Sequence, residues 1–543
     1  MNRKKIIISS LIFIAAFDGF AQQKTLVNDT TIKATTIEIT QIYQPQIKQA
    51  VKETYAPTLP KTENKKPSFE YTVPSQTQNY SYKPLPLQPL AFGSDTTPKG
   101  FKNYLKVGAG NLRTIFADAG IGSLNTEKFS SNIHLGLLSQ KGEHNYQKQT
   151  TAILDGIGNY SFKKAKAAFD LTASHHNFFQ YGYDESTQPN KIAGRQTLSG
   201  GRFSAALYDN DFDNNGFRKN AQAGISFYTG NNINSEISFL AKAGADKFMD
   251  SNWIGHIGIE AISTQLSSAS YNISNGFASL RLGTSYDNKN MLFRVCLIPT
   301  IGQNQNSFLL SDVELRFRIP KAHAIIGAGL KGSLIQNTYQ QLFLTNPYIS
   351  QFSSVQTHNN ELFGFVEKAF GHHLTFSGKL SWWQYENLAT FLNGPLVQEK
   401  MMVYYIPKVN AISAQMGMRY QIGNNISVGG QLLLFNYYNI ALNKHVWHMP
   451  TTRLNGDFLW NPIPELSLTA YLSYVGGNYA LDSALQEVKL KPYIDMGFGS
   501  EYIAMKKISL FLNINNLLNN KYQRWQGYQA FGINIYGGVR LKF

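Results

Sequence analysis

The chain has 543 residues, and its 50 Lys and Arg outnumber its 34 Asp and Glu, which gives a formal charge of +16. The basic residues are scattered along the chain, which argues against nucleic acid as a partner. Beyond the N-terminus no stretch approaches about 18 uncharged apolar residues, and the mean hydropathy is −0.25; together these exclude a helical membrane protein. Because Cys296 is the single cysteine, no intrachain disulfide can form.

Residues 1–21 have the organisation of a signal peptide. The basic start Met1–Lys5 precedes the apolar stretch Ile6–Phe17, and small residues around Ala21 suit signal peptidase. The alternative is an N-terminal anchor helix, but the apolar stretch is shorter than the about 20 residues that a membrane-spanning helix needs. We therefore expect export and cleavage after Ala21. Since no cysteine follows this stretch, we expect no lipid at the new N-terminus.

Residues 22–100 form a proline-rich segment. Nine of the 19 prolines of the chain lie between residues 45 and 98. Proline at this density blocks both helix interiors and central strands. We expect an extended periplasmic arm, with polyproline II character in its second half and no folded plug domain. Within the arm, Thr35–Tyr43 alternates enough to add as a strand to a partner protein.

Residues 101–543 alternate apolar and polar residues in stretches of about 10, separated by short turns, which is the signature of a transmembrane barrel. In the last strand, the face that suits lipid carries Phe531, Ile533, Ile535, Val539, Leu541 and Phe543. The face that suits water carries Asn534, Tyr536, Arg540 and Lys542. A soluble β-sandwich is the alternative, but its polar face would carry more charge.

Ten short turns can be placed, and tight turns lie on the periplasmic side of such barrels. We expect them near Asn125, Lys164, Asp211, Asp250, Lys289, Pro320, Gly371, Gly423, Pro462 and Lys506. Ten turns separate eleven hairpins. The predicted fold is therefore all-β: a transmembrane antiparallel β-barrel of about 22 strands, with a range of 16 to 22, behind the N-terminal arm.

The longest outer connections are expected at about 177–197, 336–358 and 519–530, and they are too modest to code an elaborate external domain. Several aromatic residues lie near expected strand ends: Trp382, Trp383, Tyr404, Tyr405, Tyr437, Tyr438 and Trp525. An interfacial aromatic girdle is the favoured interpretation of these residues, and ligand stacking is the alternative.

No motif points to a metal, a cofactor or catalysis. Residues Asp209–Gly216 have oxygen ligands at alternate positions but depart from a calcium loop, so a solvated turn is expected. The pairs His175–His176 and His372–His373 place neighbours on opposite faces of a strand and cannot chelate alone. We expect no enzyme, although a motif search would miss serine or aspartate catalysis assembled across strands.

The last 140 residues resemble the C-terminal half of a TonB-dependent receptor barrel. The resemblance is carried by Pro407–Asn410, Met418–Tyr420, Leu490–Asp495 and above all Ile508–Tyr522. Its most specific part is Asn516, Leu517, Leu518, Asn519 and Tyr522. The resemblance implies a 22-strand outer-membrane barrel for solute uptake. Members of that family also carry a plug domain and a box that pairs with TonB. Because residues 22–100 cannot fold into a plug, coupling to TonB stays open.

The chain end has the pattern that barrel assembly machinery reads as an address, with Tyr536, Val539, Leu541 and the terminal Phe543. The expected location is therefore the outer membrane of a Gram-negative cell, with membrane lipid and lipopolysaccharide as surroundings. An open lumen of 22 strands would breach that membrane. We therefore expect part of the 22–100 arm, or a partner protein, to occupy the lumen.

Two functions remain in competition. The first is a receptor-like transport barrel or channel with a polar path for a solute. The second is a structural or assembly subunit of an outer-membrane complex, which recruits a periplasmic or outer-membrane partner through residues 22–100.

Overall fold

The computed structural model describes residues 103–543 apart from 123–125, 127, 184–185, 187, 189, 304–305, 395–398 and 483. The expected signal peptide with Ala21 and the arm at 22–100 lie outside the described residues. No helix in the described part of the chain is long and apolar enough to cross a membrane.

Strands make up most of the described chain. The strands of the ring are β1 (Asn103–Gly110), β2 (Thr114–Ile121), β3 (Phe129–Lys141), β4 (Lys148–Ser161), β5 (Ala165–Phe179), β6 (Arg195–Asp209), β7 (Phe217–Gly230), β8 (Ser235–Asp250), β9 (Trp253–Ser267), β10 (Asn272–Asp287), β11 (Met291–Ile301), β12 (Ser307–Ile319), β13 (Ala324–Ile335), β15 (Thr357–Phe370), β16 (Leu374–Asn393), β17 (Met401–Ile422), β18 (Ile426–Tyr438), β19 (Thr452–Ile463), β20 (Leu466–Gly476), β23 (Tyr493–Met505), β24 (Ile508–Asn515) and β27 (Asn534–Lys542). The connections contain η2 (Pro320–Ala322), α4 (Tyr339–Thr345), β14 (Ile349–Gln351), β21 (Asn478–Leu481), β22 (Glu487–Leu490), β25 (Gln523–Trp525) and β26 (Tyr528–Gln529).

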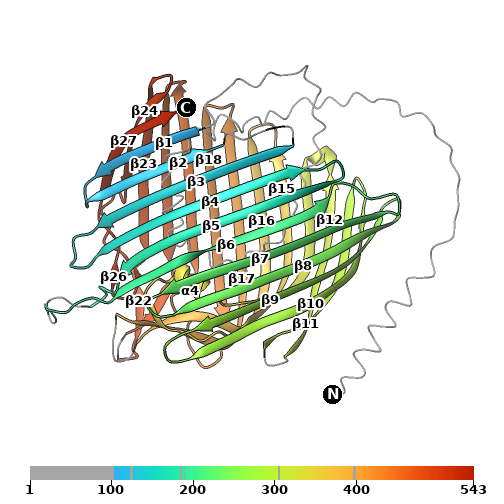
Figure 1. The fold of residues 1–543 in the computed structure, drawn as a ribbon, viewed down its shortest axis with the longest axis horizontal. Helices are drawn as coiled ribbons and strands as arrows, with labels where there is room; N and C mark the ends of the chain where they lie inside the picture. The colour runs from blue at the N-terminus through green and yellow to red at the C-terminus, as the bar shows by residue number, and fades with distance from the viewer. Residues whose placement is uncertain are drawn as a thin grey trace. The chain divides into compact units, whose positions relative to one another are not determined.

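The first and last strands close the ring. Strand β1 pairs antiparallel with β27, with Leu105 opposite Leu541, and Figure 1 shows the blue β1 beside the red β27. Asn103 N donates to Phe543 O at 3.2 Å, and Phe543 N donates to Asn103 O at 3.0 Å. Closure leaves no open edge in lipid. The prediction of a transmembrane antiparallel barrel of about 22 strands is confirmed.

Side-chain alternation sets which face each strand turns to lipid. In β27, Ile535 and Leu541 are exposed on the outer face, whereas Tyr536 and Arg540 are buried on the inner face. The expected parity of this strand is therefore confirmed. The same alternation recurs in the strands before it, such as β24, where Leu510 and Leu512 are exposed. The expected strand was too long at its start, because residues 531–533 belong to the connection before β27.

Nine of the ten short turns predicted from the sequence fall in a connection or within two residues of one, and the tenth, at Asn125, lies outside the described residues. These nine share the end of the barrel that carries Asn103 and Phe543, which is the periplasmic end. The outer end carries longer connections, and those expected around 336–358 and 519–530 occur as 336–356 and 516–533. Two further long connections, 439–451 and 477–492, were not among the longest ones expected.

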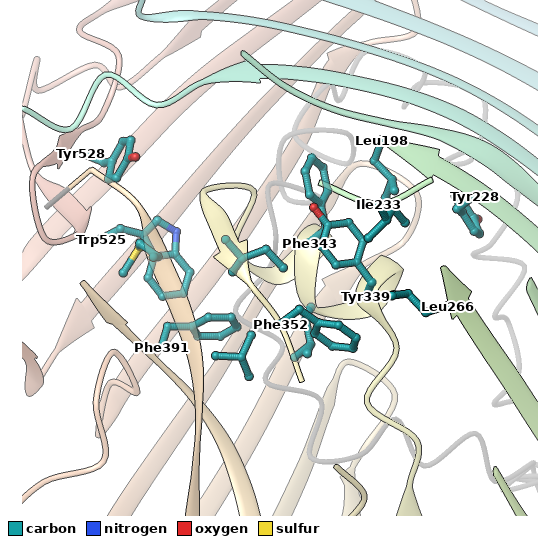
Figure 2. Close-up of a cluster of buried hydrophobic side chains, with 14 of the residues drawn as sticks. Leu198, Tyr228, Ile233, Leu266, Tyr339, Phe343, Phe352, Phe391, Trp525 and Tyr528 are labelled. Carbon is teal, nitrogen blue, oxygen red and sulfur yellow. The ribbon is translucent and has the colours of Figure 1, made fainter. Parts of the chain in front are cut away.

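The outer connections fold inward across the mouth of the barrel. One buried apolar cluster joins Leu198 of β6, Tyr339 and Phe343 of α4, and Val403 of β17. Strand β17 is ten pairings from β6 round the ring, so these walls lie on nearly opposite sides. Figure 2 shows Phe343 between Leu198 and Trp525. The chain's own loops therefore bridge the lumen at its outer end.

Candidate functional site

The candidate site is a cavity under this bridge. We call the bridge the cap and define it as connections 336–356, 439–451, 477–492 and 516–533 together with the outer ends of β16 and β17. The cap needs anchors on the wall, because irregular backbone at the mouth of a membrane protein must satisfy its polar groups within the protein.

Helix α4 is anchored at its N-terminus by the barrel wall. The carboxylate of Glu236, a buried residue of β8, accepts hydrogen bonds from Tyr339 N at 2.5 Å and Gln340 N at 3.0 Å. Thr338 Oγ1 accepts from Gln341 N at 3.2 Å. These bonds satisfy N–H groups that have no partner within the helix. The acceptor oxygens of Glu236 also lie at the positive end of the helix.

Four outer connections interlock next to α4. The ring of Tyr348 stacks on that of Tyr528 with centroids 3.5 Å apart. Tyr181 Oη donates to Gln529 O at 2.7 Å, and Tyr528 Oη donates to Glu399 O. The cap is therefore a packed unit and not a set of independent loops.

The β16–β17 hairpin bends inward at one position. Its ladder pairs Glu386 with Lys408 and Leu388 with Ile406 but skips Asn387, which has a φ of 55°. Asparagine tolerates this left-handed conformation, and Pro407, which faces the irregularity, offers no N–H to a ladder. The bent end of the hairpin then reaches the cap, where Asn393 Nδ2 donates to Gln526 O at 3.1 Å.

The residues that carry the family resemblance shape the connection before β27. Asn516 and Asn519 have φ values of 46° and 50°. Asn516 Nδ2 donates to Phe531 O at 2.7 Å, and Asn519 Oδ1 accepts from Ile533 N at 2.9 Å. The two asparagines thus fold this connection back toward the lumen, where Tyr522 joins the cap.

Of the other residues of this motif, Tyr522 packs inside the cap, whereas Leu517 and Leu518 are exposed. Tyr522 Oη donates to Asp495 Oδ2 at 2.8 Å, and its ring stacks on Tyr493 with centroids 3.8 Å apart. Leu517 and Leu518 are exposed and take no part in the cavity. In the terminal strand, Tyr536 packs against Phe116 and Phe511 in the lumen. The expected role of that strand in assembly stays a prediction.

The cavity beneath the cap has a volume of about 670 Å³. The inner faces of β3 to β6 form one wall, and α4 with β25 and β26 forms the ceiling. Gln149 Nε2 donates to Gln140 Oε1 at 2.8 Å, and Gln140 Nε2 donates to Asn534 Oδ1 at 3.0 Å. Volumes of about 300–1,000 Å³ with a few convergent polar groups are typical of small-molecule sites.

Charged residues lie at the edge of the cavity that faces the periplasmic end of the barrel, half way along the strands. Arg202 Nη2 lies 3.3 Å from Asp170 Oδ1, and Asp155 Oδ2 lies 3.8 Å from His134 Nδ1. The first contact pairs opposite charges, and the second places a histidine beside a carboxylate. This edge of the cavity therefore offers no unopposed cluster of cations for an anionic ligand.

The girdle interpretation of the aromatic residues is correct for some and wrong for others. Trp382 is exposed on the outer wall, and its Nε1 donates to Tyr438 Oη at 2.6 Å. Trp383 and Trp525 are instead buried among luminal and cap residues. The cap aromatics such as Phe343 were missed. The signal was present, since an apolar Leu–Phe–Leu run inside an outer loop has no reason to face water.

Asp246, His256 and Ser285 on the barrel wall are hydrogen-bonded in the same order as the catalytic triad of a serine hydrolase. His256 Nδ1 lies 2.7 Å from Asp246 Oδ1, and His256 Nε2 lies 2.8 Å from Ser285 Oγ. Ser285, however, is only 6% exposed, and Asp246 also binds Arg218 at 2.7 Å. Backbone N–H groups around Ser285 face ladders on both sides of β10 and cannot form an oxyanion hole. The array is a hydrogen-bonded part of the wall.

The turn at Asp209–Gly216 behaves as expected. Asp213 Oδ1 accepts from Asn215 N at 2.9 Å and from Phe217 N at 2.8 Å. These backbone hydrogen bonds hold the pKa of the Asp213 carboxyl below its ordinary value. Within the described ranges, no group of three or more His, Cys, Asp or Glu residues is placed to hold a metal ion.

Comparison with known proteins adds evidence on the fold. No protein-family model matches the chain, and no curated protein matches it. Among solved structures, the chain is similar to the FrpB iron transporter from Neisseria meningitidis, with 12% identity, a TM-score of 0.61 and 82% of both chains covered. The ferric enterobactin receptor PfeA from Pseudomonas aeruginosa is 12% identical with a TM-score of 0.59 over 81% of both chains.

The siderophore receptor PirA from Acinetobacter baumannii is 9% identical, with a TM-score of 0.61 over 82% of this chain and 80% of that one. At these identities the likeness concerns the fold. The closed ring with its apolar outer face is a structure for the outer membrane. The described chain is therefore an outer-membrane β-barrel with the barrel fold of TonB-dependent receptors.

Proposed function

We propose that this protein is an outer-membrane receptor or channel for a small solute, and that the cap closes its outer mouth. The proposal rests on one observation above all: cap residues bridge opposite walls of the ring directly over a cavity of about 670 Å³. A pore of 22 strands is wide enough for water, so a barrel that transports needs such a closure.

The arrangement supports transport more than simple anchoring. A barrel that only anchors a partner has no need of a cavity lined by convergent amides and hydroxyls such as Gln140, Gln149 and Thr151. The solved structures of similar fold include an iron transporter and siderophore receptors. Their fold is compatible with uptake, while the solute of this chain is a separate question.

Single-channel conductance in planar bilayers tests the proposal. The full-length protein is compared with a variant in which residues 339–352 are replaced by a Gly-Ser linker of equal length. We expect low conductance for the full-length protein and frequent large openings for the variant. A circular dichroism spectrum controls for folding of the barrel.

Equal, low conductance in both proteins, and again in the same pair without residues 22–100, would contradict closure by the cap. In that case the anchoring alternative gains support, and a pull-down through residues 22–100 should retrieve one dominant protein. The roles expected for the arm and for TonB stay predictions.

A further inference from the structure

We infer that the cavity under the cap binds a neutral, polyhydroxylated solute of the oligosaccharide class. This inference rests on the proposed function and names the ligand chemistry of the same site. It is carried by the neutral polar wall, the aromatic surfaces and the balance of charge around the cavity.

The wall presents neutral hydrogen-bonding groups in a regular array. Gln149 and Thr151 of β4 and Thr172 and Ser174 of β5 occupy alternate positions and therefore face the same side. In the described part of the chain, the side chains of Thr172 and Ser174 make no hydrogen bond to protein. Hydroxyls and amides can each donate and accept, which matches the double character of a sugar hydroxyl.

Aromatic surfaces lie beside this array. Phe178 of β5 and Phe531 of the connection before β27 line the cavity, and Phe178 packs against the buried Phe343 of α4 with ring centroids 6.2 Å apart. The face of an aromatic ring is negative and attracts the weakly positive C–H groups of a neighbour. A sugar ring has hydroxyls at its edge and C–H groups on its faces. Its hydroxyls would bind the polar wall, and its faces would pack against the aromatic rings.

The charges disfavour the chemistry of an anionic ferric chelate. Among the described lining residues, the two carboxylates Asp155 and Asp495 match the two arginines Arg202 and Arg524 in number. Arg202 lies beside Asp170, and Arg524 Nη2 donates to Thr345 O at 3.3 Å. A multiply charged anion would lose its hydration without finding an excess of cations over carboxylates in the described lining, which is costly. A neutral solute avoids this cost.

Isothermal titration calorimetry of the full-length protein in detergent tests the inference. The probes are maltotriose, cellotriose and mannotriose as neutral trisaccharides, trigalacturonate as an anionic trisaccharide, and a ferric catecholate chelate. We expect at least one neutral trisaccharide to bind, with weaker or undetectable binding of both anionic probes.

Variants locate the binding. Gln149→Leu combined with Thr172→Val removes two neutral polar groups and should weaken the bound trisaccharide about tenfold or more. Gln431→Leu makes the same amide change on the inner face of β18, outside the cavity, and should leave affinity within about twofold. Thermal unfolding of all variants checks that they fold.

Three outcomes would overturn the inference: no neutral trisaccharide binds at about 10 mM, an anionic probe binds more tightly than every neutral one, or the double variant binds as the unmodified protein does. Conductance separates these outcomes from failure of the proposed function. If the cap variant opens but no neutral sugar binds, the ligand class is wrong while closure by the cap stands.

Discussion

The anchor of α4 on Glu236 gives a sharp test of the cap. Replacing Glu236 with alanine removes the acceptor of two backbone N–H groups in a buried place. A buried donor left without a partner costs about 1–3 kcal/mol, so the loss of the acceptor for two donors costs about 2–6 kcal/mol before local relaxation. Since about 1.4 kcal/mol is a factor of ten, opening of this end of α4 should rise at least about thirtyfold.

Hydrogen exchange measures this opening directly, because exchange of a buried amide reports the free energy of local opening. The amides of Tyr339 and Gln340 should lose protection in Glu236→Ala, and single-channel records should show more frequent openings. Glu236→Gln keeps one acceptor oxygen, so its amide protection and its opening frequency should fall between those of the unmodified protein and Glu236→Ala.

Glu260→Gln is the matched control. Glu260 lies on β9 and pairs with Lys242 at 2.7 Å, away from α4. This variant should leave protection in α4 and conductance unchanged. If Glu236→Ala also left both unchanged, the wall would not hold the cap, and the reasoning from the anchor would be refuted.

Four further predictions follow from other parts of the barrel. Burial lowers the pKa of His448 to about 3, below its value near 6.5 in the unfolded chain. The contribution of His448 to stability is therefore full above pH 6.5 and is lost as the pH falls toward 3. Between pH 7 and pH 4 the melting temperature of the unmodified protein should fall more than that of His448→Asn. Asn387→Val should destabilise the hairpin by about 1–2 kcal/mol at its positive φ, whereas Asn387→Gly should not, as chemical denaturation can show. A fluorophosphonate probe should leave Ser285 unlabelled, and labelling that disappears in Ser285→Ala would contradict our structural assignment. Phe543→Ala should lower the amount of assembled, heat-modifiable barrel several-fold while Phe543→Trp preserves it.

The ring of strands could be predicted from the sequence because the residue pattern of each strand and turn depends only on its own neighbourhood. Each strand meets lipid on one side and the lumen on the other, so a period of two in residues such as Leu510 and Leu512 fixes the faces without knowledge of the partner strand. Short turns are local too, since a few residues such as those at Asp209–Gly216 satisfy their own backbone.

The contacts of the cap could not be predicted from the sequence, because they join residues far apart along the chain. Tyr348 meets Tyr528, and Glu236 meets Tyr339. An outer loop that lies in water and one that folds inward can have similar lengths, and only apolar residues inside the loop distinguish them. Trp525 was assigned to the girdle because a tryptophan near a strand end suits an interface as well as a buried cluster.

The cavity and the anchor share α4, and this has a consequence for coupling. Gln340 lines the cavity, while its backbone N–H is held by Glu236. A solute that binds better when the cap is closed must make the cap harder to open, and one that binds better when the cap is open must favour opening, by the same factor in each direction. At saturation the solute shifts the opening equilibrium by the ratio of its affinities for the closed and open states. A Glu236→Ala variant whose conductance shows a predominantly open cap should therefore differ from the unmodified protein in affinity by that same ratio. Agreement of the two factors would tie recognition to gating through a single helix, whereas an unchanged affinity in a predominantly open variant would mean that the solute binds both states of the cap alike.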